Sequence, residues 1–169
     1  YGVARIYTPE DGQKMGLQGM INDMLARCDF NPVEHAPAEL RPGDFRALAR
    51  VISAFELGVC GSTLKKKIHE KAEKQKAPVL GVTGTGGSGK SSLTDELVRR
   101  FRLDQGDTIR LAIISIDPSR KRTGGALLGD RIRMNAIEHP NIYMRSLATR
   151  ETGSEVSAAL PEVIAACKL

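Results

Sequence analysis

The stretch Gly84-Thr85-Gly86-Gly87-Ser88-Gly89-Lys90-Ser91 decides how the rest of the chain is interpreted. It matches the pattern G-x-x-x-x-G-K-[ST], in which glycines allow the backbone to wrap closely around phosphate oxygens. The loop amides and the positive end of the following helix favour a polyphosphate, and Lys90 adds a point charge. The hydroxyl of Ser91 is a ligand of the kind that Mg²⁺ prefers. The motif therefore predicts a phosphate loop for a purine nucleoside triphosphate with Mg²⁺.

The sequence on both sides of this loop has the pattern of an α/β domain. Residues 78–83 form a short apolar run without alternation, which is typical of a parallel strand buried on both faces. An apolar stripe predicts a helix directly after the loop, and residues 111–116 and 141–146 predict two further strands. A last stripe over residues 156–167 predicts a final helix. Together these elements predict an open parallel sheet with flanking helices, the fold of P-loop NTPases.

Two other interpretations of the glycine-rich segment stay open. Gly84 to Gly89 also reads G-x-G-x-x-G, the fingerprint of a dinucleotide-binding fold, and Asp117 ends the next strand where that fold places an acidic residue. Lys90 and Ser91 argue against a dinucleotide, because such a site needs no cation and hydroxyl there. A flexible Gly-Ser turn with an exposed lysine is disfavoured by the strand and helix expected around it.

Carboxylates and cations near the second predicted strand complete the candidate site. Asp117 ends that strand at the carboxyl edge of the sheet, where ligands bind in such folds. Asp130 follows a long loop, and both carboxylates are candidate Mg²⁺ ligands. The alternatives, a turn role for Asp117 before Pro118 and a helix N-cap role for Asp130, stay open. Among the nearby basic residues, Arg133 is the preferred cation for the transferring phosphate.

The first 28 residues predict one strand and one helix. Residues 3–7 read as a short strand, and Thr8 followed by Pro9 has the form of a helix start. An apolar stripe at residues 17–25 then requires a covering surface, which a single strand and helix do not provide. We therefore expect the end of a domain here.

The next segment combines a proline-rich stretch with two helices. Residues 29–43 carry three prolines among polar residues and predict a linker. The stripe from Phe45 to Phe55 predicts a helix that ends near Gly58, and residues 62–76 predict a lysine-rich second helix.

Composition and charge narrow the class of protein. The formal net charge of +5 comes largely from lysines between residues 65 and 76, and only 4% of residues are aromatic, so we expect no nucleic-acid partner. Three distant cysteines favour reduced thiols and a cytoplasmic location, and no apolar run is long enough for a membrane span. The opening residues lack the features of a signal peptide and indicate a start within a longer protein.

Three blocks of sequence resemble the GTPase chaperones of adenosylcobalamin-dependent mutases, the MeaB/ArgK type. The blocks run from Gly81 to Ser92, from Asp117 to Ser119 and from Arg122 to Met134. The resemblance implies GTP or GDP as ligand and a nucleotide-responsive switch after the second strand. It implies a Mg²⁺ site around Ser91, Asp117 and Asp130, with Lys90 taking part in catalysis. The nucleotide-binding positions that it implies are Gly86, Gly87, Ser88, Gly89, Lys90, Ser91, Ser92 and Arg133.

The order of the segments is similar to that of fused isobutyryl-CoA mutases, in which a cobalamin-binding domain, a linker and a G domain precede a mutase barrel. By this resemblance residues 1–28 end a Rossmann-like cobalamin-binding domain, residues 29–76 form linker helices, and residues 77–169 begin the P-loop GTPase domain. The whole enzyme would then isomerise isobutyryl-CoA to n-butyryl-CoA with adenosylcobalamin, and GTP hydrolysis would gate cofactor loading. An acyl-CoA substrate, an adenosyltransferase partner and a homodimer belong to the same expectation.

Several motifs of these families are missing from the sequence. The Asp-x-His-x-x-Gly pattern of the cobalt ligand is absent, so none of His35, His69 and His139 is assigned to cobalamin. The Asn-Lys-x-Asp motif and the acidic Walker B strand are absent too, and the choice of GTP over ATP rests on resemblance alone. Two other functions stay open: a stand-alone GTPase chaperone of methylmalonyl-CoA mutase, and a non-catalytic module whose lysine-rich helix binds an acidic partner.

Overall fold

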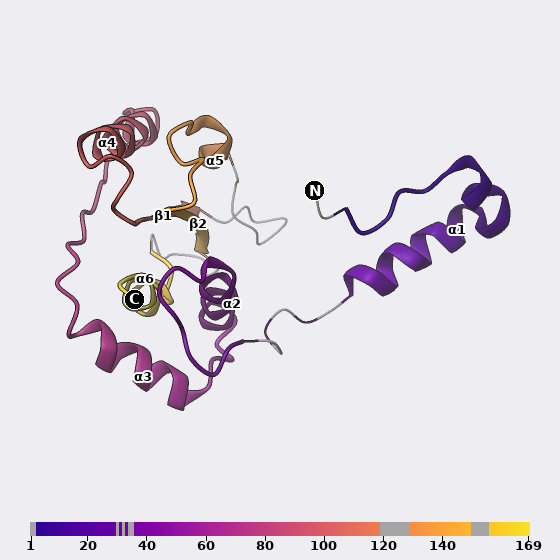
Figure 1. Ribbon diagram of the computed structural model, residues 1–169, viewed down its shortest axis with the longest axis horizontal. Coiled ribbons are helices and arrows are strands. Elements are labelled where there is room, and N and C mark those ends of the chain that lie inside the picture. Colours follow the sequence, from indigo (N-terminus) through magenta and orange to yellow (C-terminus); the bar gives the residue numbers. More distant parts are fainter. Residues whose placement is uncertain (1–2, 30, 32, 34–35, 119–128, 150–155) are drawn as a thin grey trace. The chain divides into compact units, whose positions relative to one another are not determined.

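The chain divides into two compact units, Tyr1–His35 and Ala36–Leu169. The computed structural model describes residues 3–29, 31, 33, 36–118, 129–149 and 156–169, without the side chains of residues 117, 118, 129 and 130. Figure 1 labels the helices and strands of both units.

The first unit contains one helix, α1 (Pro9–Cys28). The predicted start is confirmed, because the Thr8 hydroxyl accepts the Asp11 amide at 3.3 Å and the Asp11 carboxylate accepts the Thr8 amide at 3.0 Å. Gly16 has a φ of 65° and kinks the helix, which the sequence analysis did not predict. No residue of α1 is buried, so its apolar stripe has no cover among the described residues of this unit.

The strand predicted at residues 3–7 is wrong, because these residues have no strand structure. A strand needs a neighbour to accept and donate its backbone hydrogen bonds, and the described part of this unit holds no second strand. Tyr7 is instead fixed by its hydroxyl, which donates to the Asp23 carboxylate at 2.7 Å.

The second unit begins with the two predicted helices, α2 (Phe45–Glu56) and α3 (Ser62–Ala72). The Asp44 carboxylate caps α2 by accepting the Ala47 amide at 2.9 Å. Gly58, with a φ of 69°, lies just beyond the end of α2, where the sequence predicted a stop. Helix α3 ends four residues earlier than the predicted limit at residue 76.

The sheet of the second unit is a parallel pair, β1 (Leu111–Pro118) and β2 (Ile142–Thr149). Leu111 lies opposite Ile142 and Pro118 lies opposite Thr149, so both carboxyl ends meet at one edge. Helix α5 (Gly129–Arg133) lies between the two strands in the chain, and α6 (Leu160–Cys167) follows β2. The predicted parallel α/β fold is confirmed for these elements.

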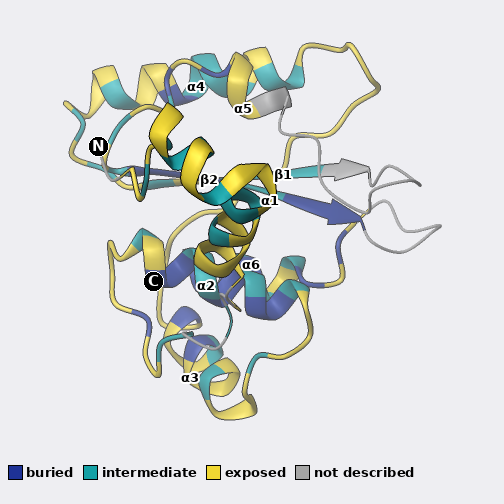
Figure 2. Ribbon diagram, turned by 90° about the vertical axis from the view of Figure 1, so that its right-hand side faces the viewer, coloured by how far each residue is buried: buried dark blue, intermediate teal, exposed yellow. Residues whose placement is uncertain are grey.

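Helices cover both faces of the strand pair (Figure 2). Helices α2 and α6 lie on one face with α3 beyond them, and α4 (Lys90–Asp104) and α5 lie on the other face. Alternation along β2 explains this arrangement, because Tyr143 and Leu147 pack with α2 and α6 while Ile142 packs with Val98 of α4. The core of the unit is therefore concentrated on the α2 and α6 side.

The strand predicted at residues 78–83 is wrong in this structure. These residues form an exposed trace between α3 and α4, and Leu80 is 73% exposed. A strand buried on both faces requires neighbours that pair with its backbone, and within the described residues β1 and β2 pair only with each other. The strand–helix–strand unit expected around the phosphate loop is consequently present only from α4 onward.

Candidate nucleotide-binding site

The glycine-rich loop leads directly into the first turn of α4. Gly89 is the N-cap of this helix with a φ of 85°, and Gly87 has a φ of 78°. Side chains rarely adopt these angles, so glycine is required for this path. No side chain caps the helix start, and an uncapped helix N-terminus favours an anionic ligand.

Lys90 lies across the loop that precedes it. Its ammonium donates to the carbonyl oxygen of Gly84 at 2.7 Å and to that of Thr85 at 2.8 Å. The loop is closed by the amide of Ser88, which donates to the carbonyl of Thr85 at 3.3 Å. A cation is thus held beside a helix N-terminus, an arrangement that favours a phosphate group.

The atoms around each loop glycine show where the loop has room for a side chain or a ligand. A Cβ atom at Gly84 would lie 2.9 Å from the Ser88 hydroxyl and 3.7 Å from the Lys90 stem. A side chain there would therefore push against the residues that shape the loop. No heavy atom lies within 4 Å of a Cβ built at Gly86, Gly87 or Gly89, so the outer side of the loop is open.

Seven of the eight predicted nucleotide-binding positions, all except Arg133, form one continuous segment. Ser91 and Ser92 occupy the first turn of α4, directly after Lys90. The loop residues are exposed, and Lys90 and Ser91 are half-buried. The structure thus brings together Gly86, Gly87, Ser88, Gly89, Lys90, Ser91 and Ser92, and their binding of a nucleotide stays a prediction.

The remaining predicted site residues come from the following elements. Asp117 lies next to the carboxyl end of β1, and Asp130 lies in α5, but their side chains are outside the described part of the chain. Helix α5 packs against α4, and Arg133 is its last residue. The Arg133 side chain is exposed. The Mg²⁺ ligands Ser91, Asp117 and Asp130 therefore stay a prediction. Among the described residues, no three His, Cys, Asp or Glu side chains cluster as a metal site.

Two polar side chains of α4 that the sequence did not single out hold the segment after α5. The Asp95 carboxylate accepts the Ala136 amide at 2.8 Å, and the Arg102 guanidinium donates to the Ala136 carbonyl at 2.8 Å. Nothing in the sequence marks these residues, because polar residues at such positions are ordinary on an amphipathic helix.

Two carboxylates on or near α4, Glu96 and Asp107, form ion pairs with arginines of this helix. Hydrogen bonds from Arg99 and Arg100 lower the pKa of the half-buried Glu96 carboxyl to about 2. A hydrogen bond from Arg102 also lowers the pKa of Asp107, a residue with a φ of 58° just beyond the helix. Both carboxylates are therefore ionised at neutral pH, and neither lies in the phosphate loop.

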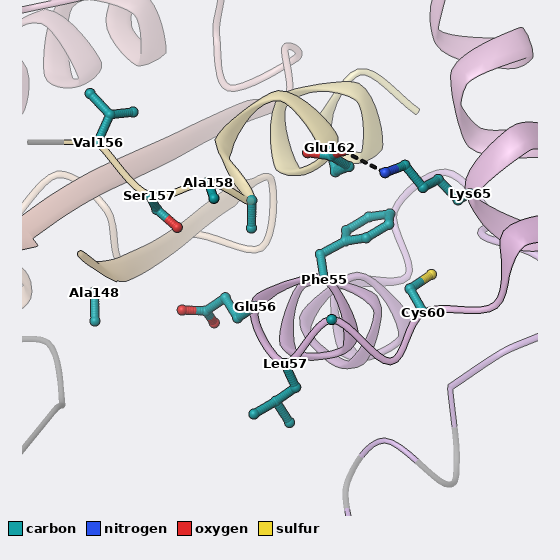
Figure 3. A pocket seen from close by; sticks show the side chains of 12 residues that line it. Phe55, Glu56, Leu57, Cys60, Lys65, Ala148, Val156, Ser157, Ala158 and Glu162 are labelled. Atoms are coloured by element: carbon teal, nitrogen blue, oxygen red, sulfur yellow. Dashed lines mark ion pairs between the residues drawn. The ribbon is translucent and has the colours of Figure 1, made fainter. Parts of the chain in front are cut away.

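A pocket of about 400 Å³ lies elsewhere, where the ends of α2 and β2 meet the start of α6 (Figure 3). Phe55, Ala148 and Ser157 line it, and at its rim Lys65 pairs with the Glu162 carboxylate at 2.7 Å. None of the loop residues 84–92 lines this pocket. It is distinct from the candidate phosphate site.

The family model described as "Methylmalonyl Co-A mutase-associated GTPase MeaB" matches residues 48–168. The chain belongs to this family. The match includes the phosphate loop, both strands and helices α3 to α6. It also reaches back into α2, one of the helices assigned to a linker.

Relatives of this MeaB-family chain extend the similarity to its first residues. It is 66% identical to the fused isobutyryl-CoA mutase of Cupriavidus metallidurans over 99% of this chain and 16% of that protein. It is 52% identical to the fused isobutyryl-CoA mutase of Geobacillus kaustophilus, again over 99% of this chain and 16% of that protein. The chain therefore spans about a sixth of the length of these curated relatives. Among the described residues, no helix combines the length and apolarity that a bilayer crossing requires.

Proposed function

We propose that this segment binds and hydrolyses GTP with Mg²⁺ through the loop Gly84–Ser91. The observation that carries the proposal is the ammonium of Lys90, held by two loop carbonyls beside the uncapped N-terminus of α4. Membership of a family described as GTPase supports guanine over adenine as the base. The proposal extends to a role in the chemistry of an acyl-CoA mutase.

The chemistry at this site would be electrostatic. Phosphoryl transfer needs positioning and neutralisation of charge on the phosphate oxygens more than it needs covalent catalysis. Lys90 and the first amides of α4 would orient the phosphates, and Arg133 would add a cation at the transferring phosphate. Ser91, Asp117 and Asp130 would hold Mg²⁺, which supplies further neutralisation when bound.

The proposal for the whole protein rests on its relatives. Two fused isobutyryl-CoA mutases match 99% of this chain, so we infer that residues 1–28 end a cobalamin-binding domain and residues 77–169 begin the GTPase domain. The intact enzyme would interconvert isobutyryl-CoA and n-butyryl-CoA with adenosylcobalamin, and GTP hydrolysis would gate cofactor loading. A homodimer, an adenosyltransferase partner and a cytoplasmic location remain parts of this proposal.

Substitution of Lys90 in the intact protein tests the proposed site. Lys90→Ala should abolish GTP hydrolysis, because the mutation removes the cation that reaches the phosphates. Lys67→Ala, which removes an exposed lysine from α3, is the matched control and should leave turnover unchanged. Undiminished hydrolysis in Lys90→Ala contradicts the site assignment.

A second measurement separates the proposed whole-protein roles. Isomerisation of isobutyryl-CoA by the intact protein supports the fused mutase, and GTP hydrolysis without isomerisation indicates a stand-alone chaperone. Absence of nucleotide binding leaves the non-catalytic module, for which the lysines of α3 would be the binding surface. Competition between GTP and ATP for the same site identifies the preferred base.

A further inference from the structure

Helix α4 holds Ala136 by two polar side chains, Asp95 and Arg102, which we call the clasp. Asp95 and Arg102 lie two helical turns apart, so they project from the same side of α4. The Asp95 carboxylate accepts the amide of Ala136, and the Arg102 guanidinium donates to the carbonyl of the same residue, each at 2.8 Å. Both backbone groups of Ala136, which is 7% exposed, are thereby bound to one helix.

The clasp continues into the neighbouring turn. Nε of Arg102 donates to the Asp107 carboxylate at 2.7 Å, which holds the guanidinium in place. The Asp107 carbonyl accepts the side-chain amide of Asn141 at 2.8 Å, one residue before β2 begins. The segment from Ala136 to Asn141 is thus fixed to α4 and to the turn after it by directional bonds.

The apolar cluster on this face is small. It has three buried members, Val98, Ala136 and Ile142, and the partly buried Leu111, Ile113 and Ile137 pack against them. Other apolar residues of α4 stay outside it, since Leu93 is 53% exposed and Phe101 is 45% exposed. Small apolar contacts carry little directional information, whereas two hydrogen bonds to one peptide unit define its position.

The position of the clasp relates two parts of the proposed site. Asp95 follows Lys90 by five residues, which is about 7.5 Å along a helix axis. Arg133 precedes Ala136 by three residues, a span of at most about 11 Å of backbone. The bonds that hold Ala136 on α4 therefore limit how far the end of α5 can move relative to the phosphate loop.

We infer that Asp95 and Arg102 are positioning residues, which hold Arg133 at a fixed place relative to Lys90 by binding Ala136. The inference rests on the proposed GTPase function. Neither residue is proposed to touch the nucleotide. They act through the end of α5, so their loss should slow the chemical step more than it weakens nucleotide binding by the loop.

Steady-state GTP hydrolysis by four variants of the intact protein tests this role. Asp95→Ala removes the acceptor, and kcat should fall by about tenfold or more, because small misplacements of a catalytic group reduce rate strongly. KM and the affinity for a fluorescent GDP analogue should stay within about threefold, because Lys90 and the loop are unchanged. Asp95→Asn retains an oxygen that can accept the Ala136 amide, and its kcat should stay within about threefold of wild type.

Two further variants keep the test decisive. Arg102→Met keeps the apolar stem but removes the second bond to Ala136, so it should also lower kcat, and it decides the matter if Asp95→Ala does not fold. Asp104→Ala removes an exposed carboxylate from the same helix and should change nothing.

The results separate a failure of the proposed GTPase function from a failure of the positioning role. A wild-type protein that does not hydrolyse GTP overturns both the proposed function and this inference. A hydrolysing wild type with unchanged kcat in the folded Asp95→Ala and Arg102→Met variants overturns the inference alone. Equal impairment of Asp95→Asn and Asp95→Ala also contradicts it, because the retained acceptor should preserve the position of Ala136.

Discussion

The two faces of the strand pair are held by different kinds of interaction. On the face covered by α2 and α6, apolar burial dominates, and Leu147 and Val163 are completely inaccessible to solvent. On the face covered by α4, a small apolar cluster is supplemented by the bonds from Asp95 and Arg102 to Ala136. The nucleotide-side helix is therefore placed by few, directional contacts, whereas the opposite helices are fixed by a continuous core.

A large-to-small substitution in the continuous core should have the largest effect on stability. Leu147→Ala should lower the free energy of local unfolding by about 3 kcal/mol, because it removes buried methyl groups and leaves a cavity. Leu93→Ala on α4 should cost less than about 1 kcal/mol, since this side chain is half exposed. Hydrogen exchange of the β2 amides in the intact protein measures both values, and equal costs would contradict the difference between the faces.

The continuous core also contains one ion pair that can be broken. Arg145 of β2 donates to the Glu56 carboxylate of α2 at 2.7 Å and to the Ser53 hydroxyl at 3.1 Å. Glu56 is 7% exposed, so Glu56→Ala should cost about 2 kcal/mol by leaving a partly buried guanidinium unpaired. The double variant Glu56→Ala/Arg145→Met should cost less than the sum of the single variants, and additive costs in this cycle would contradict the coupling.

The strongly patterned elements were predictable from the sequence. Thr8 marked a helix start correctly because its side chain accepts a backbone amide in the same short segment. The stripe from Phe45 to Phe55 indicated its buried face, and the loop Gly84–Ser91 indicated the start of α4. These features depend on neighbours in the chain, which a sequence displays directly.

Features that depend on distant partners were not predictable. The apolar runs at residues 3–7 and 78–83 have strand composition, but a strand also needs a paired neighbour, and neither run has one among the described residues. The Arg145–Glu56 pair joins residues 89 positions apart, and the bonds to Ala136 join residues 34 and 41 positions apart. The side chains of Asp117 and Asp130 lie outside the described part, so their assignment to Mg²⁺ stays a prediction.

Removal of the Tyr143 hydroxyl tests whether a polar contact contributes to the stability of the α2 and α6 face. Tyr143 packs near Phe45 with ring centroids 5.4 Å apart, and its buried hydroxyl has no hydrogen-bond partner among the described residues. Burial raises the pKa of this hydroxyl to about 12. Tyr143→Phe should therefore be neutral or stabilising by up to about 1 kcal/mol. A clear loss of stability would indicate that the hydroxyl is bonded and that polar contacts contribute to this face.

The smallest expected effect is a loss of stability at acid pH on the α4 side, caused by protonation of Asp107. The hydrogen bond from Arg102 lowers the pKa of Asp107 below its ordinary value of 3.8. The folded state therefore binds this proton less readily than the unfolded state, and the stabilisation is present above pH 3.8 and lost as pH falls through the folded pKa. Because the Asp107 side chain is 42% exposed, solvent screens its interaction with Arg102 and the effect on stability should be small.

A comparison with Asp107→Asn measures this dependence. The difference in exchange protection between wild type and variant, followed near Asn141, should be full at pH 6 and should shrink as the pH falls below 3.8. A difference that stays unchanged as the pH falls below 3.8 would show that the carboxylate charge does not contribute.

Equilibrium titration of the intact protein with a fluorescent GTP analogue tests the phosphate loop most directly. We expect saturable binding that weakens when Mg²⁺ is removed. Lys90→Ala should lower the affinity by about a hundredfold, the size of effect expected from removing a charged hydrogen-bond donor at a phosphate. Competition by excess GDP but not by a nicotinamide dinucleotide should accompany it. Unchanged affinity in Lys90→Ala, or displacement of the analogue by the dinucleotide, would contradict the assignment of Gly84–Ser91 as the phosphate site.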